Sequence, residues 1–269
     1  LTQPTISAHI SSLEKELNAR LFVRNTKEVK LSDDGKDLYR YARQMIDLQK
    51  KIEERFETGK EESKHLITIA ASTIPAQYLL PKILMKFNER YPKEQVKLLE
   101  TDSSQVVTQI IDHMVDVGFT GTVLEKKHCK YIPFYKDELV VITPNTEKYQ
   151  ELLEDMPDDI SWIGGEHLIM REEGKQLRAA GINLDKLKII ASIENQETIK
   201  KSVKQGMGIS VISRLAAEDE VKYGDLLAFS IPKADQGRDI NLVYNKNYQM
   251  SKSTERFVKI VKEVYGIEE

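Results

Sequence analysis

Apolar residues recur at helical spacing along the first stretch of the chain. They fall at Ile6, Ile10, Leu13 and Leu17, which places them on one narrow face of an α-helix. The opposite face carries small or hydroxyl-bearing side chains and one lysine, at Pro4, Ser7, Ala8, Ser11 and Lys15. Small side chains let a helix approach another surface closely, and the DNA major groove admits a helix. An ordinary amphipathic surface helix is the alternative.

The next residues predict a short β-hairpin. Residues 21–24 are apolar and extended, residues 25–27 (Asn-Thr-Lys) form a turn, and residues 28–31 alternate charged and apolar side chains. A helix followed by a basic hairpin is the second half of a winged helix-turn-helix, in which the helix enters the major groove. Arg24, Lys27 and Lys30 would then hold the phosphate backbone of DNA.

A long helix is predicted after the hairpin. Ser32 supplies an N-cap, Asp33 and Asp34 place negative charge at the helix start, and the helix runs to about Glu57. At 1.5 Å per residue it is roughly 36 Å long. Its apolar residues mostly follow three- and four-residue steps, at Leu38, Tyr41, Ala42, Met45, Leu48, Ile52 and Phe56. This seam favours a helix that pairs two subunits, and a helix packed on its own domain is the alternative.

The opening residues resemble a known family. The stretch that carries the resemblance is LTQPTISAHISSLEKELNARLFVRNTKEVKLSDDG, which is similar to the DNA-binding end of LysR-type transcriptional regulators. Thr2 is a good N-cap for the first helix by its residue type. The resemblance implies that the start of this recognition helix faces the groove and that Arg24 touches DNA from the wing. The groove-facing residues it implies are Gln3, Pro4, Thr5, Ser7 and Ala8, with Ser11 one turn further along.

Two features depart from the family pattern. Position 8 is often basic in relatives and is Ala8 here, which puts base readout by a long side chain at that point in doubt. A recognition helix also needs a preceding partner helix to bury its apolar stripe, and no residues upstream of Leu1 supply one. We therefore expect residues 1–269 by themselves to bind DNA poorly or not at all.

From Leu66 the pattern changes to alternating strands and helices, which indicates an α/β domain with mixed or parallel sheets. Helices are predicted over Pro75–Tyr91, Ser103–Val115 and Thr254–Tyr265. Strands are predicted at Leu66–Ala70, Val96–Leu99, Asp116–Gly121, Leu139–Ile142, Leu168–Arg171, Lys188–Ile193, Gly208–Ile212 and Ile240–Tyr244.

The family resemblance supplies the division of this region. It implies two subdomains joined by two crossovers, like the periplasmic solute-binding fold, with crossovers near Thr143-Pro144 and between Lys233 and Arg238. The expected architecture is α/β: a winged helix-turn-helix plus a long linker helix, then a two-subdomain, periplasmic-binding-protein-like effector domain. The expected boundaries are 1–31 for the partial DNA-binding domain, 32–58 for the linker helix, 59–65 for a charged hinge, 66–143 with 239–269 for the first subdomain, and 144–238 for the second.

A ligand is expected between the subdomains, where strands end and helices begin. Hydroxyl and amide side chains occur at such points, and a helix start suits an anion. The candidate contacts are Ser72, Thr73, Thr120, Thr122 and Asn195, with Thr143 and Arg171 as further candidates. Simple helix capping is the alternative for each hydroxyl. The segment ASTIPAQYLLP also resembles a LysR-type branch associated with sulfur or selenium metabolism, which implies a small sulfur-containing or oxoanion effector.

Other chemistry is not indicated. The single cysteine, Cys129, excludes an internal disulfide and fits a reducing cytoplasm. The five histidines lack metal-ligand spacing, and no catalytic or cofactor motif occurs. The expected protein is a cytoplasmic, dimeric or tetrameric DNA-binding regulator that contacts RNA polymerase if it activates transcription. A solute-binding protein or cleft enzyme on the same scaffold is the alternative, and it leaves residues 1–57 unexplained.

Overall fold

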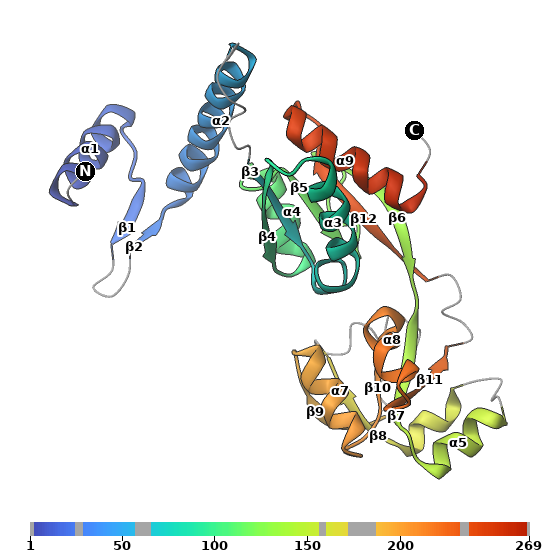
Figure 1. Cartoon of the computed structure of the whole chain (residues 1–269). Coiled ribbons are helices and arrows are strands. Elements are labelled where there is room, and N and C mark those ends of the chain that lie inside the picture. The colour runs from blue at the N-terminus through green and yellow to red at the C-terminus, as the bar shows by residue number, and fades with distance from the viewer. Residues whose placement is uncertain are drawn as a thin grey trace.

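The computed structural model describes residues 3–24, 29–56, 66–155, 160–171, 187–231 and 237–267. Figure 1 shows a helix with a hairpin, a long single helix, and two lobes of mixed sheet and helix. No helix within these ranges is long and apolar enough to cross a membrane.

The first part of the chain forms the predicted helix and hairpin. Helix α1 spans Gln3–Leu17, and strands β1 (Phe22–Arg24) and β2 (Val29–Leu31) pair antiparallel, with Phe22 opposite Leu31. The predicted N-cap Thr2 and the turn at residues 25–28 lie outside the described residues. The Glu14 carboxylate accepts a hydrogen bond from the Leu21 amide at 2.8 Å, which ties the helix to the hairpin.

The linker helix α2 spans Asp33–Phe56 and confirms the predicted long helix. Its start is built against the hairpin. The Ser32 hydroxyl accepts a hydrogen bond from the Gly35 amide at 2.9 Å, as an N-cap does. A Cβ atom on Gly35 would lie 2.0 Å from the Leu21 carbonyl oxygen. Only glycine therefore allows α2 to begin this close to the hairpin.

The first lobe contains a five-stranded sheet in the order β4-β3-β5-β12-β6. Strands β3, β4 and β5 are parallel to one another, and β12 runs antiparallel to both β5 and β6. Helix α4 packs on one face through Val106 and Ile110, and α3 and α9 cover the other through Phe87 and Phe257. The bounds are β3 Leu66–Ala71, β4 Gln95–Glu100, β5 Val117–Thr120, β6 Cys129–Asp137, β12 Arg238–Asn245, α3 Leu80–Arg90, α4 Ser103–Ile111 and α9 Lys252–Tyr265.

The second lobe is built on a three-stranded sheet in the order β10-β7-β11. Strands β8 and β9 form a parallel pair that joins this sheet through a bridge between Leu168 and Ile209. The bounds are β7 Leu139–Pro144, α5 Glu147–Glu154, η2 Ser161–Gly165, β8 His167–Met170, β9 Lys188–Ser192, α7 Gln196–Lys204, β10 Ser210–Ser213, α8 Arg214–Lys222 and β11 Leu226–Ser230.

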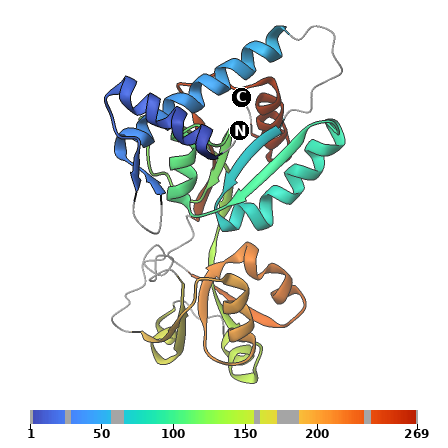
Figure 2. The ribbon, with the colours of Figure 1, turned by 90° about the vertical axis from the view of Figure 1, so that its left-hand side faces the viewer.

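The first crossover lies earlier in the chain than predicted. Both views show β6 running from one lobe to the other (Figure 1 and Figure 2), and β7 already pairs with β10 and β11 in the second lobe. Thr143 is therefore inside β7, opposite Leu227, and the chain crosses near Glu138. The prediction failed because β6 was not recognised in the sequence. Lys233 lies outside the described residues, whereas Arg238 opens β12 and returns the chain to the first lobe.

The predicted helix at Pro75–Tyr91 is divided in two. Residues Pro75–Leu79 form a π-helical turn, closed by a hydrogen bond from the Leu80 amide to the Pro75 carbonyl, and α3 follows. Pro81 lacks an N–H, so it suits the first turn of a new helix and cannot serve inside one. Single π-turns often occur at functional sites, and this one follows Ser72 and Thr73.

Candidate functional site

The outward face of α1 carries the residues predicted to meet DNA. Pro4, Ser7 and Ala8 are exposed, while Thr5 and Ser11 are half-buried. Lys30 is exposed on β2 of the hairpin. Thr2 and Lys27 lie outside the described residues, and the side chains of Gln3 and Arg24 are not described. The face therefore offers small side chains and hydroxyls beside a lysine on the wing.

The apolar stripe of α1 is open. Ile6, Leu13 and Leu17 are exposed to 45%, 38% and 46%. No described element of the chain covers these side chains, and α1 stands apart from both lobes in Figure 1. This agrees with the expectation that a recognition helix needs another helix on this side.

The linker helix α2 also exposes its apolar seam. Tyr41, Met45, Leu48 and Ile52 have exposures of 51% to 72% in the single chain. An exposed apolar surface of this length is typical of a protein interface. The helix touches the first lobe as well, because Arg43 donates to the His113 carbonyl at 3.5 Å.

Arg171, which follows β8, makes a polar contact between the lobes. Its Nη2 donates to the Thr73 hydroxyl across the cleft at 3.3 Å. Its Nη1 donates to Gln196 Oε1 at 3.1 Å, and its Nε donates to the Glu194 carbonyl at 3.0 Å. Arg171 thus links the loop after β3 to the start of α7. These are the positions where the sequence predicted ligand contacts.

A pocket of about 250 Å³ lies around this contact. Its lining combines residues of both lobes and includes Thr73, Gln77, Glu100, Arg171, Asn195 and Gln196. Asn195 caps α7, because its Oδ1 accepts from the Thr198 amide at 2.9 Å. Gln196 is 4% exposed, and its Nε2 is buried with no hydrogen-bond partner among the residues that the structure describes. A buried amide group without a partner is uncommon, and a ligand oxygen would satisfy it.

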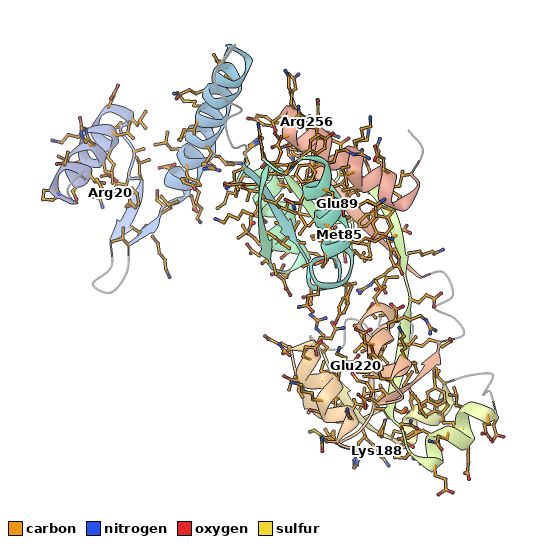
Figure 3. All side chains as sticks on the ribbon, viewed as in Figure 1. Arg20, Met85, Glu89, Lys188, Glu220 and Arg256 are labelled. Carbon is orange, nitrogen blue, oxygen red and sulfur yellow. The ribbon has the colours of Figure 1, made fainter. Side chains whose placement is uncertain are left out.

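A second polar cluster lies beside the pocket. The Tyr78 hydroxyl from the first lobe lies 3.5 Å from Glu197 on α7. Lys200 is 7% exposed and bridges Glu197 at 2.8 Å and Glu220 on α8 at 2.7 Å, and Figure 3 labels Glu220 on that helix. Burial lowers the pKa of Lys200, but hydrogen bonds to the two carboxylates outweigh it and raise the pKa overall. Lys200 therefore stays charged and balances acidic groups on both helices.

Not all predicted contacts come together in this pocket. Thr73, Arg171 and Asn195 line it, whereas Ser72, Thr120, Thr122 and Thr143 do not. The Thr120 hydroxyl is buried and donates to the Thr122 carbonyl at 2.9 Å. Thr143 is fully buried within β7, and its hydroxyl lies 3.3 Å from the Pro144 carbonyl. Thr143 therefore lies within the sheet of the second lobe. It lies neither at the crossover between the lobes nor in the pocket.

Sequence reasoning missed the acidic side of the pocket. Glu100 is the last residue of β4, one position beyond the predicted strand, and Gln77 lies in the π-turn. A signal in the sequence could have identified Glu100: it is a charged residue at the carboxyl end of a strand. The carboxyl ends of parallel strands such as β3 and β4 meet at one edge of the sheet, where ligands bind.

Metal and thiol chemistry find no support among the residues that the structure describes. No group of three or more His, Cys, Asp or Glu side chains within those ranges could hold a metal ion. Cys129 is 3% exposed, and burial raises the pKa of its thiol to about 11. A reactive cysteine needs a lowered pKa and access to solvent, so Cys129 serves as a packing residue.

Two family models match the chain. Residues 1–36 match "Bacterial regulatory helix-turn-helix protein, lysR family", and residues 60–266 match "LysR substrate binding domain". Among curated relatives, an uncharacterised helix-turn-helix-type transcriptional regulator of Methanocaldococcus jannaschii is 28% identical, over 98% of this chain and 90% of the relative. The regulator YeiE of Escherichia coli is 27% identical, over 96% of this chain and 87% of its own length.

Solved structures share the fold. A full-length OxyR variant of Pseudomonas aeruginosa superposes with a TM-score of 0.75 at 19% identity, covering 99% of this chain and 86% of that one. The full-length regulator CbnR, solved with its target DNA, gives a TM-score of 0.65 at 16% identity, covering 98% and 90%. The CcmR regulatory domain of Synechocystis, in complex with 2-PG, gives 0.66 at 23% identity, covering 76% and 99%.

Proposed function

Because the chain belongs to the LysR family of DNA-binding transcriptional regulators, we propose that it senses a small effector with an anionic group in the cleft at Arg171. The family and its relatives are regulators rather than enzymes, and they combine a helix-turn-helix with an effector-binding domain. The solute-binding protein or cleft enzyme considered as an alternative does not account for residues 1–36, which match the DNA-binding family.

One observation carries the effector proposal. Arg171 and Gln196 of one lobe and Thr73 of the other line the same pocket, and the Nε2 of Gln196 is buried without a hydrogen-bond partner among the described residues. A guanidinium binds carboxylates and other oxoanions through paired donors. We propose a carboxylate or oxoanion on the effector as the group held here. The resemblance of ASTIPAQYLLP to the sulfur- and selenium-associated branch supports a small, sulfur-containing molecule.

The pocket is lined by residues of both lobes, which suggests how a bound effector could change the protein's conformation. Because its donors come from both lobes, an anion that bridges them binds the closed arrangement more tightly than an open one. A ligand shifts such an equilibrium only through this difference in affinity. We propose that closure repositions the DNA-binding heads of an assembly held together by α2.

The exposed seam of α2 supports a dimer, and we propose that two such dimers form a tetramer. Paired heads suit the twofold operators that helix-turn-helix proteins read. The residues proposed to contact DNA are those of the exposed α1 face and of the wing, named above. The protein would act in the cytoplasm, where operators are located, and would contact RNA polymerase if it activates transcription.

A gel-shift titration tests the proposal. The full-length protein is titrated onto the DNA upstream of its own gene, with and without sulfate, sulfite and small carboxylates. We expect a shift whose midpoint one of these anions changes, and we expect Arg171→Gln to remove the anion effect but keep DNA binding. Arg214→Gln is the matched control, because Arg214 pairs with Glu138 on an exposed surface outside the pocket. No shift under any condition would exclude the regulator proposal for this DNA.

A further inference from the structure

The pocket at Arg171 has a charge balance that a simple anion does not match. Its lining holds one guanidinium, Arg171, and three carboxylates, at Glu100, Glu194 and Glu197. Like charges close together disfavour binding. A purely anionic molecule held by Arg171 would therefore sit beside three exposed acidic groups that repel it, whereas a positive group on the same molecule would be attracted to them.

The three carboxylates differ in how they are balanced. Glu197 forms an ion pair with Lys200 at 2.8 Å, so its charge is already compensated. Glu100 accepts hydrogen bonds from Gln77 at 3.1 and 3.3 Å, and Gln77 is neutral. Within the described ranges, neither Glu100 nor Glu194 forms an ion pair with a lysine, arginine or histidine. The first lobe thus contributes an exposed carboxylate that has no cationic partner among the described residues and that accepts hydrogen bonds from Gln77.

The opposite side of the same pocket supplies donors. Gln196 is 96% buried, and its Nε2 has no partner in the described part of the chain, while its Oε1 accepts from Arg171 at 3.1 Å. The hydrogen bond from Arg171 to Oε1 orients the amide with its oxygen toward Arg171 and its N–H groups away from it. This unpartnered buried amide points to a ligand oxygen independently of the acidic residues.

We propose that the effector is a small zwitterion of amino-acid size, whose carboxylate binds Arg171 and Gln196 and whose ammonium group binds Glu100. The proposal rests on the proposed effector function of this cleft and adds the positive group to it. An ammonium offers three donors and no acceptor, which suits a carboxylate oriented by Gln77. Because Glu100 belongs to the first lobe and Arg171 to the second, such a molecule spans the cleft by its two charges.

The pocket size agrees with this class. A volume of about 250 Å³ is below the roughly 300–1,000 Å³ typical of sites for drug-sized ligands. An α-amino acid places its two charged groups on one carbon atom, so it presents both within a small molecule.

Thermal shift and calorimetry on the full-length protein test the proposal. The probes are the common L-amino acids tested singly, the des-amino carboxylic acid that corresponds to each, and sulfate. The variant is Glu100→Gln, which keeps the shape and the contact to Gln77 but removes the charge. The control is Glu89→Gln, which removes the same charge from an exposed position on α3, labelled in Figure 3.

We expect one amino acid to raise the Tm of the wild type and of Glu89→Gln. In Glu100→Gln the Kd for that amino acid should rise at least about tenfold, which corresponds to the loss of a charge-assisted hydrogen bond. Its des-amino analogue should bind the wild type weakly and Glu100→Gln more tightly, because a repulsion is removed. This exchange of preference would not result from a folding defect.

The other outcomes separate the two proposals. If sulfate or a des-amino acid binds the wild type as well as any amino acid does, and Arg171→Gln abolishes that binding, the zwitterion is wrong and the anionic effector stands. If an amino acid binds Glu100→Gln as tightly as it binds the wild type, the proposed role of Glu100 is refuted. If no probe binds, the zwitterion proposal fails together with the effector site at Arg171.

Discussion

The guanidinium of Arg171 lies 3.3 Å from the hydroxyl oxygen of Thr73, and the two residues belong to different lobes. They are 98 positions apart in the chain, so only the folded protein brings them together. This hydrogen bond crosses the cleft at the pocket where we place the effector. Any molecule that joins the same two groups stabilises the lobes in this arrangement.

Thr73→Val tests the part of Thr73 in this contact. The substitution removes the hydroxyl but nearly keeps the shape, and the bond is only partly buried. We expect the unliganded protein to lose about 1 kcal/mol or less. An effector at about 100 times its Kd adds about 2.7 kcal/mol of stability to the wild type, and we expect most of that gain to disappear. Thermal unfolding with and without effector measures both effects.

The control for this prediction is Thr108→Val. The Thr108 hydroxyl donates to the Ser104 carbonyl at 3.0 Å on an exposed part of α4, away from the pocket. An equal loss of the effector's stabilisation in both variants would remove Thr73 from the site.

The two crossovers are joined by a buried ion pair. Asp137 at the end of β6 has a fully buried carboxylate, which accepts from Arg238 at 2.8 and 2.9 Å and from the Ser213 hydroxyl at 2.6 Å. Arg238→Met would leave this carboxylate without its cation. Breaking a buried pair in this way costs about 3–5 kcal/mol. Urea unfolding should show that the free energy of unfolding falls by about 3 kcal/mol, the lower end of this range, because the Arg238 side chain is itself 33% exposed.

Arg214→Met is the matched comparison. Arg214 pairs with Glu138 at 2.8 Å, and the side chains are 44% and 55% exposed. Exposed pairs contribute about 0–1 kcal/mol, so this variant should unfold close to the wild-type midpoint. Similar losses in both variants would show that burial of Asp137 is not what makes the crossover pair strong.

Gly35→Ala tests the contact between linker helix and hairpin. The new Cβ would lie 2.0 Å from the Leu21 carbonyl oxygen, which is backbone and cannot move aside alone. Overpacking of this kind costs about 1–3 kcal/mol. We expect weaker DNA binding in a gel shift of the full-length protein, with effector binding unchanged. Gly165→Ala should have little effect on either, since its Cβ would meet no atom within 4 Å.

The raised pKa of the Cys129 thiol predicts how the stability of the protein depends on pH. Burial, followed by the nearby Glu125, raises the pKa of its thiol from near 9 to about 11. Between these values the unfolded thiol loses its proton while the folded one keeps it. The contribution of Cys129 to stability is therefore complete below about pH 9 and decreases as the pH rises toward 11. Urea unfolding of the wild type and of Cys129→Ala, compared from pH 8 to pH 11, measures this difference.

Alkylation gives a second readout for Cys129. At pH 8 the folded protein should react with iodoacetamide much more slowly than the urea-unfolded protein, because the thiolate is the nucleophile. Equal rates in the two states would contradict the buried, neutral thiol.

Elements with strong local periodicity were predictable. The helix at Gln3–Leu17, the hairpin and the linker helix at Asp33–Phe56 agree with the structure to within a few residues. Strand β6 was missed, because Pro133 and charged residues interrupt its alternation. Its pairing with β12, rather than its own composition, makes it a strand. That omission shifted the predicted crossover from Glu138 to Thr143.

The candidate site was only partly predictable for a related reason. A hydroxyl after a strand predicts either a cap or a ligand contact, and the sequence did not distinguish Thr73, which lines the pocket, from Thr120, which bonds the Thr122 carbonyl. Glu100 was not recognised, because its meaning depends on Arg171 in the other lobe.

The amino-acid sequence alone determined the order of parts in this regulator: a first helix, a hairpin, a long helix and an α/β effector region. Those features follow from hydrophobic spacing, capping and turn residues, which act over a few positions. The tertiary structure alone decided where the chain crosses between lobes and which polar groups share the cleft. Contacts such as Arg171 with Thr73 depend on how distant strands register against one another, and no local pattern encodes that register.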